Sequence, residues 1–138
     1  MINDFRGEYQ YLSNFWLCNV AFDGIVYTSS ESAFQAAKSL DQNTRSKFSN
    51  MSPVVSKRAG RKIILRPDWE EVKIEVMTRV VKNKFQKGSF ITQSLLETEN
   101  QELIEGNTWN DTFWGVCNGK GENNLGKILM ERRKELNG

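Results

Sequence analysis

The stretch from Glu31 to Lys38 combines residue types that support proton transfer and nucleophilic attack. It contains an acid, an amide and an amine, at Glu31, Gln35 and Lys38. In a helix, positions seven apart point within roughly 20° of each other and are separated by about 10 Å along the axis. A ribose fits in a gap of this length. The spacing therefore predicts a carboxylate and an amine that face one ligand.

Both ends of this stretch also have an ordinary structural explanation. Thr28-Ser29-Ser30-Glu31 has the form of a capping box, in which Glu31 bonds back to the backbone N–H of Thr28. Lys38 is then a solvated lysine in the last helical turn, where the helix dipole favours a cation. The pattern alone leaves the catalytic and the structural explanations open.

A second stretch, Asn107 to Gly126, places a carboxylate among aromatic rings and glycines. Asp111 lies between Trp109 and Trp114, and several glycines follow. Glycine lets a backbone approach a ligand closely, and a helix that starts at residue 123 or 124 offers N–H groups to a phosphate. The glycine spacing matches neither the dinucleotide fingerprint nor the P-loop. An aromatic core corner followed by an ordinary helix start explains the same residues.

The composition restricts the chemistry further. The 138 residues contain no histidine, which excludes a Ser-His-Asp triad and every His-ligated metal site. Lys and Arg number 19 against 17 Asp and Glu, a balance that does not by itself indicate a nucleic-acid binder. Cys18 and Cys117 form no C-x-x-C pair, and no stretch approaches the ~18 apolar residues of a membrane span. We therefore expect a cytoplasmic protein that uses carboxylates, lysines or tyrosines.

Turn and cap signals predict the elements that position these residues. Asp23-Gly24 between two apolar runs predicts a β-hairpin over residues 17–27, followed directly by a helix over about 29–40. Further helices are expected near 43–49, 54–62, 68–85, 89–97 and 123–136, and short extended pieces and loops at 102–121. This order predicts one α+β domain, residues 1–138, dominated by helices with a small antiparallel sheet.

Taken in order, the motifs of the chain resemble those of the NADAR family, whose name refers to NAD and ADP-ribose. They include Leu12-Ser13-Asn14-Phe15, Ser30-Glu31, Gln35-Ala36-Ala37-Lys38, Arg66-Pro67-Asp68-Trp69, Lys84-Phe85, Asp111-Thr112-Phe113-Trp114-Gly115 and Gly121-Glu122-Asn123-Asn124-Leu125-Gly126. No single motif is specific, but the ordered set covers nearly the whole chain. One segment departs: Val116-Cys117-Asn118 stands where many relatives carry a Gly/Asp-rich run.

The resemblance implies an N-glycosidase that cleaves the bond between ribose C1 and a nitrogen, with no cofactor and no metal. The implied substrates are ribosylamino-pyrimidine phosphates of the riboflavin pathway or ADP-ribosylated guanine in nucleic acid. A non-catalytic ADP-ribose-binding or nucleotide-binding module is the alternative. The expected catalytic residues are Glu31, Lys38, Trp69 and Asp111, and the expected substrate-binding residues are Ser13, Asn14, Phe15, Gln35, Trp114, Gly115, Gly121 and Asn123. The oligomeric state is left open.

Two routes to bond cleavage are compatible with these residues. Departure of the base builds positive charge on the ribose, which one carboxylate stabilises while a second activates water. Alternatively, a lysine with a lowered pKa attacks C1 of an opened ribose and forms a Schiff base. Lys38 is the candidate nucleophile, with Glu31 as proton shuttle. Glu31 and Asp111 are expected to converge on one pocket, lined by Trp69 and Trp114.

Overall fold

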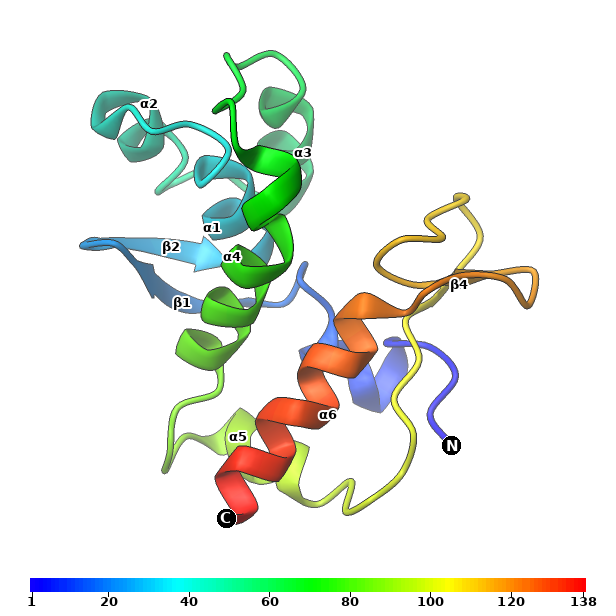
Figure 1. Cartoon of the computed structure of the whole chain (residues 1–138). Helices are drawn as coiled ribbons and strands as arrows, with labels where there is room; N and C mark the ends of the chain where they lie inside the picture. The colour runs from blue at the N-terminus through cyan, green and yellow to red at the C-terminus, as the bar shows by residue number, and fades with distance from the viewer. The chain divides into compact units, whose positions relative to one another are not determined.

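The computed structural model describes all residues, Met1–Gly138, and the chain forms two compact units. The central unit is Asn14–Lys84. The terminal unit combines the two ends of the chain, Met1–Ser13 and Phe85–Gly138. Figure 1 shows the elements of each unit. No helix combines the length and the apolar character needed to cross a membrane.

The central unit is built on a β-hairpin of β1 (Leu17–Phe22) and β2 (Ile25–Ser29). The two strands are antiparallel, with Val20 opposite Tyr27. The turn residues Asp23 and Gly24 both have positive φ, 47° and 86°, as a type I′ turn requires. The hairpin predicted from the Asp-Gly dipeptide is therefore confirmed.

Four helices complete the central unit: α1 (Ser30–Ala36), α2 (Gln42–Lys47), α3 (Pro53–Gly60) and α4 (Trp69–Lys84). Within this unit, α1 and α4 lie against the hairpin and α3 packs on α1 (Figure 1). The helices occur near their expected positions, apart from the ends of α1. The core of the unit consists of buried apolar side chains, among them Val20, Phe22, Tyr27, Phe34, Met77 and Val80.

The start and the end of α1 differ from the prediction. Ser29, not Thr28, is the N-cap, because the Ser29 side chain accepts from the backbone N–H of Ser32. Thr28 Oγ1 instead donates to the carbonyl of Met51 at 3.0 Å. The capping box predicted for Thr28 and Glu31 is therefore wrong. The helix also ends at Ala36 rather than near residue 40.

Tight i→i+3 hydrogen bonds explain the early end of α1. The N–H of Lys38 donates to Gln35 and the N–H of Ser39 donates to Ala36, at 3.2 and 3.1 Å. Such bonds close a 3₁₀-type turn and do not continue an α-helix. Lys38 thus lies in the turn that follows α1, where its carbonyl accepts from the N–H of Arg66 at 2.8 Å.

The terminal unit contains the 3₁₀ helix η1 (Gly7–Leu12), α5 (Phe90–Leu96), β3 (Gly106–Asn107), β4 (Val116–Cys117) and α6 (Asn124–Asn137). Strands β3 and β4 are parallel and only two residues long, which confirms the expected short extended pieces. Helix α5 packs on α6. The short helix η1 was not predicted, because six residues without an apolar period give no clear signal. Helices dominate and both sheets have two strands, so the α+β class is confirmed.

Candidate active site

Glu31 is buried near the start of α1, with 8% of its surface exposed. Its backbone N–H donates to the carbonyl of Asn14 at 3.0 Å, which ties α1 to the segment expected to bind substrate. On its side chain, Oε2 accepts a hydrogen bond from Gln35 Nε2 at 2.6 Å. The Glu31 carboxylate is thus held by a side chain one turn further along the helix. Because Ser29 caps the helix, capping does not explain why an acid stands here.

Lys38 is half-buried and lies within electrostatic reach of Glu31. Burial is the largest influence on its pKa and lowers it. The Glu31 carboxylate opposes this effect and raises the pKa, whereas the cations Arg61 and Lys73 lower it further, so the net direction is downward. The predicted acid and amine therefore lie within electrostatic reach of each other. A lowered pKa increases the fraction of neutral amine, which is the nucleophilic form.

Trp69, the first residue of α4, packs against Phe34 of α1. It is buried, with 5% of its surface exposed, and its ring lies 5.0 Å from the ring of Phe34 at a tilt of 57°. Phe34 lies on α1 between Glu31 and Lys38. The indole thus supports the helical turn that carries the candidate residues. This contact belongs to the core of the central unit.

The predicted segment 13–15 is placed by several contacts. The N–H of Ser13 donates to the carbonyl of Gln10 at 3.0 Å, where Ser13 caps η1 in the terminal unit. Asn14 Nδ2 lies 3.6 Å from the sulfur of Met77. Phe15 is 40% exposed, and the ammonium group of Lys57 lies 5.9 Å from the centre of its ring. Asn14 contacts Glu31 directly through its carbonyl, which accepts from the Glu31 N–H.

Asp111, in the terminal unit, organises its own loop. Its Oδ1 accepts the backbone N–H groups of Phe113 and Trp114 at 3.2 and 2.9 Å. Its backbone N–H and carbonyl both bond to the side-chain amide of Asn107, at 3.1 and 2.9 Å. The rings of Phe113 and Trp114 meet edge to face at 4.8 Å. The convergence of Asp111 with Glu31 stays a prediction.

Gly115, Gly121 and Asn123 each make close contacts with other residues of the terminal unit. A Cβ added to Gly115 would lie 1.8 Å from a carboxylate oxygen of Glu105, and one added to Gly121 would lie 2.1 Å from the Gly115 carbonyl. The side chain of Asn123 donates to the carbonyl of Leu103 and accepts from the N–H of Glu105, both at 2.9 Å. The close backbone approach at these glycines is therefore to protein atoms.

The N–H groups at the start of α6 already have partners. Three of them, from Asn123, Asn124 and Leu125, donate to the carbonyls of Gly115, Phe113 and Trp114 at 3.3, 3.2 and 3.0 Å. A phosphate binds at a helix start through N–H groups that lack such partners. Of the two explanations left open by the sequence, this arrangement favours the ordinary helix start, because the preceding loop supplies carbonyl acceptors.

The segment that departs from the family pattern forms β4 and a tight turn. Cys117 and Lys120 exchange two backbone hydrogen bonds of 2.9 and 3.1 Å. Between them, Asn118 and Gly119 have positive φ, 53° and 76°, as in a type I′ turn. The Asn-Gly dipeptide was the sequence signal for this turn, and the prediction missed it.

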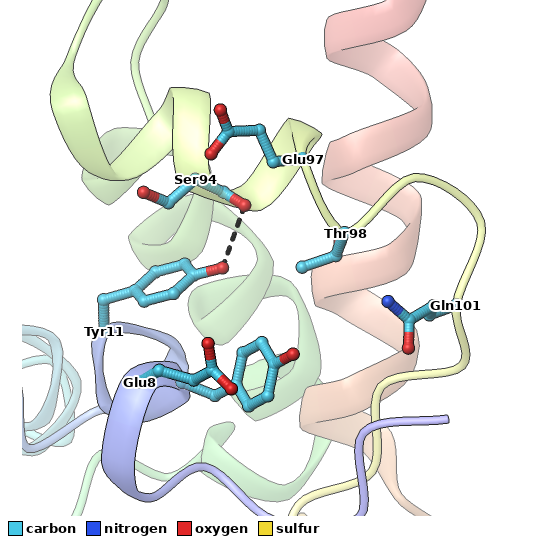
Figure 2. A pocket seen from close by; sticks show the side chains of 7 residues that line it. Glu8, Tyr11, Ser94, Glu97, Thr98 and Gln101 are labelled. Atoms are coloured by element: carbon cyan, nitrogen blue, oxygen red, sulfur yellow. Dashed lines mark hydrogen bonds between the residues drawn. The ribbon is translucent and has the colours of Figure 1, made fainter.

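The terminal unit also holds a cavity of about 240 Å³. It is lined by Glu8, Tyr9, Tyr11, Ser94, Glu97, Thr98 and Gln101, none of them a predicted site residue. In Figure 2 the Tyr11 hydroxyl donates to the Ser94 carbonyl, at 2.9 Å. Burial, followed by the neighbouring Tyr9, Glu97 and Glu8, raises the pKa of Tyr11 to about 12. Tyr11 therefore stays protonated at neutral pH.

No cluster of three or more acids or cysteines could hold a metal ion.

Comparison with known proteins identifies the family. The model of the NADAR domain matches residues 3–137. The chain belongs to the NADAR family. It is 40% identical over 133 residues to "N-glycosidase YbiA" of Shigella boydii, covering 94% of this chain and 82% of that protein. It is 35% identical over 130 residues to "Riboflavin biosynthesis protein VVA0006" of Vibrio vulnificus, covering 91% of this chain and 35% of that protein.

A solved structure shares the NADAR fold. The NMR structure of the Escherichia coli protein YbiA aligns with a TM-score of 0.84 and 36% sequence identity. The alignment covers 99% of this chain and 87% of that chain. The resemblance inferred from the ordered motifs, and the α+β fold that it implied, are thereby confirmed.

Proposed function

We propose that this NADAR protein is an N-glycosidase that hydrolyses the bond between ribose C1 and a nitrogen in a ribosylamino-pyrimidine phosphate. The observation that carries the proposal is the buried Glu31 carboxylate, which lies within electrostatic reach of Lys38, an amine with a lowered pKa. The printed names of the relatives, an N-glycosidase and a riboflavin biosynthesis protein, support the reaction and the substrate class. Glu31, Lys38, Asp111 and Trp69 remain the proposed catalytic residues.

In the first route, Glu31 acts through its charge. The C1–N bond breaks, the electron pair leaves with the base, and the base takes up a proton. Positive charge then develops on the ribose, and the Glu31 carboxylate stabilises it. Asp111 is proposed to accept a proton from the water that adds its oxygen to C1. Gln35 supports this role because it holds one oxygen of the Glu31 carboxylate at 2.6 Å.

In the second route, Lys38 forms a bond to C1. The ribose ring opens, the neutral Lys38 amine attacks C1, and the base leaves with a proton that Glu31 transfers. Water then adds to the resulting imine, which releases the sugar and restores the amine. The lowered pKa of Lys38 supports this route because it increases the fraction of neutral amine at a given pH.

The substrate phosphate is proposed to bind near Lys38. Arg61 and Lys73 both lower the pKa of Lys38, so cations from different segments of the central unit lie within electrostatic reach of it. Lys73 is already paired with Glu70 at 2.8 Å, which leaves exposed Arg61 as the stronger candidate for the phosphate. A guanidinium suits this task because it binds phosphate in bidentate geometry.

The two tryptophans and the domain assignment keep their place in the proposal. Trp69 and Trp114 are proposed to line the pocket and to contact the base or the sugar. We also propose that residues 1–138 act as one domain, since the family model spans both units. The free thiols of Cys18 and Cys117 support a cytoplasmic location.

A product assay tests the function. The protein is incubated with ribosylamino-pyrimidine phosphate and, separately, with an oligonucleotide that carries ADP-ribosylated guanine, and released base and sugar are measured. Release from the first substrate is the expected result. If the protein binds ADP-ribose but releases product from neither substrate, the non-catalytic binding module is the correct description.

One observation favours the oligonucleotide as a second substrate class. The segment 57–66 carries Lys57, Arg58, Arg61, Lys62 and Arg66 and contains no acid. Such a basic run attracts a phosphodiester backbone, and the attraction weakens as salt is raised. Turnover of the oligonucleotide that falls steeply with salt, together with salt-independent turnover of the small substrate, would assign this segment to nucleic acid.

Lys38 decides between the two routes. If Lys38 forms the imine, borohydride added during turnover traps a ribosyl adduct on the Lys38 peptide, and Lys38→Arg abolishes turnover. If Lys38 only pairs with the substrate phosphate, arginine keeps the charge, a good part of the activity remains, and no adduct is trapped. We expect the adduct.

A further inference from the structure

Gly60, at the end of α3, lies directly against the side chain of Gln35. A Cβ built on Gly60 would lie 1.9 Å from Gln35 Oε1 and 2.8 Å from Gln35 Cδ. Both distances are far below any real contact, and the atoms belong to a buried side chain with 6% of its surface exposed. Any residue other than glycine at position 60 would therefore displace the Gln35 amide.

The backbone of α3 does not require a glycine at this position. Gly60 is the last residue of α3 and is not among the glycines with positive φ, so its conformation is open to any L-residue. Glycine is a poor helix former compared with alanine. The space that Gln35 occupies is thus the feature of the structure that explains the residue type.

Gln35 is oriented by its amide nitrogen, while its amide oxygen forms no hydrogen bond. An ionised carboxylate only accepts hydrogen bonds, so the amide nitrogen must face Glu31, and it does so at 2.6 Å. The amide oxygen is then directed away from Glu31, and it has no hydrogen-bond partner. An unpartnered oxygen gives this orientation no support of its own. Its surroundings at Gly60 therefore decide whether the side chain stays in place.

The packing of α1 on α3 keeps the two helices close at this point. One turn before Gly60, the hydroxyls of Ser56 and Ser32 lie 2.6 Å apart. Ser32 follows Glu31 on α1, and both serines are fully buried. The separation of the helices is thus set by small residues, which leaves no room for a larger side chain at position 60.

We infer that Gly60 is a positioning residue of the active site: its lack of a side chain lets Gln35 hold the Glu31 carboxylate in its reactive orientation. The inference rests on the proposed catalytic role of Glu31. Gly60 itself is not expected to touch the substrate. Its effect is transmitted through Gln35 alone.

A double-mutant cycle tests the inference. Gly60→Ala is expected to lower kcat by about 100-fold with little change in KM, since small displacements of a catalytic group cost this much. Gln35→Ala is expected to lower kcat to a similar extent. In the double variant, Gly60→Ala should add no further loss of kcat, because the side chain that it displaces is already gone.

Two readouts separate this inference from the proposed function. In the intact protein without substrate, Gly60→Ala should shift the side-chain amide resonance of Gln35 in a ¹⁵N–¹H NMR spectrum and lower Tm. In the Gln35→Ala background, Gly60→Ala should no longer lower Tm. If the wild-type protein hydrolyses no substrate, the proposed function fails, and these two measurements still decide whether Gly60 positions Gln35.

Ser56→Ala is the matched control in the same helix interface. It removes the bond to Ser32 and is expected to lower Tm. The kcat should stay within about twofold of the wild-type value, and the Gln35 resonance should not shift. Gly60→Ala with normal kcat and an unshifted Gln35 resonance would overturn the inference. Independent, multiplicative effects of Gly60→Ala and Gln35→Ala on kcat would also overturn it.

Discussion

The stretch around Glu31 and the loop around Asp111 each contain a carboxylate among aromatic and polar residues, but they differ in what their polar groups contact. In α1, the Glu31 carboxylate is held by the side chain of Gln35 and lies near the charge of Lys38. In the loop, the side chains of Asp111 and Asn123 bond to backbone groups of their own unit.

This difference shows how two similar signals in a sequence can have different causes. A loop without regular structure must satisfy its backbone N–H and carbonyl groups, and Asn and Asp side chains do this locally. In the first turn of α1, Asn14 accepts the N–H of Glu31 and Ser29 accepts that of Ser32, so the buried Glu31 carboxylate needs another explanation. Glu31 is therefore the stronger candidate for a catalytic residue. The polar side chains of the loop stabilise its backbone, in addition to any catalytic role.

The largest effect is expected from Glu31→Gln. Turnover should fall by at least ~100-fold, because the amide cannot carry the negative charge or transfer the proton. Steady-state kinetics measures the loss, and thermal unfolding should show little change. Ser29→Ala is the control: it should cost about 1 kcal/mol of stability through the lost cap, with turnover retained. Near-normal turnover in Glu31→Gln would remove the catalytic role.

Asp111→Asn applies the same acid-to-amide change in the other region. Turnover should again fall by about 100-fold, whereas stability is retained, because the asparagine oxygen still accepts from Phe113 and Trp114. Kinetics and thermal unfolding are measured together. Asp111→Ala should lower Tm as well, because it removes that acceptor. If Asp111→Asn turns over normally while Asp111→Ala is unstable, the loop is structural only.

Arg61→Ala is expected to act on binding. KM for the phosphorylated substrate should rise by about 10-fold with kcat nearly unchanged, the scale of a lost hydrogen bond to a charged group. The dephosphorylated substrate should show no such difference. Arg58→Ala removes a nearby exposed cation of α3 and serves as the control. Equal effects of the two variants would mean that the charge acts only at long range.

The smallest effect on activity is expected from Asn123→Ala. Its side chain joins the backbone of Leu103 and Glu105, so its loss should lower stability by roughly 1–3 kcal/mol. Urea unfolding measures this change, and KM should stay near the wild-type value. A raised KM with normal stability would instead assign Asn123 to substrate binding, as its sequence context first indicated.

Much of the fold could be predicted because its signals act over a few residues. Asp23-Gly24 determines a hairpin through the φ values that its turn needs, and Ser52-Pro53 starts α3 through contacts within one turn. The order of motifs was sufficient to recognise the family, and the resemblance implied the roles proposed for Glu31 and Lys38. Each of these inferences depends on residue types and short spacings, which can be read from the sequence alone.

Other features depend on contacts between segments that are distant in the chain. The aromatic and Gly-rich loop supplies the carbonyls that bond to the start of α6, which no local pattern reveals. Thr28 and Ser29 are both suitable caps, and Thr28 is drawn instead to the carbonyl of Met51. The need for glycine at position 60 exists only because α3 packs on α1 at Gln35. Tertiary packing decides these cases because it determines which polar group finds a partner and which space is already filled.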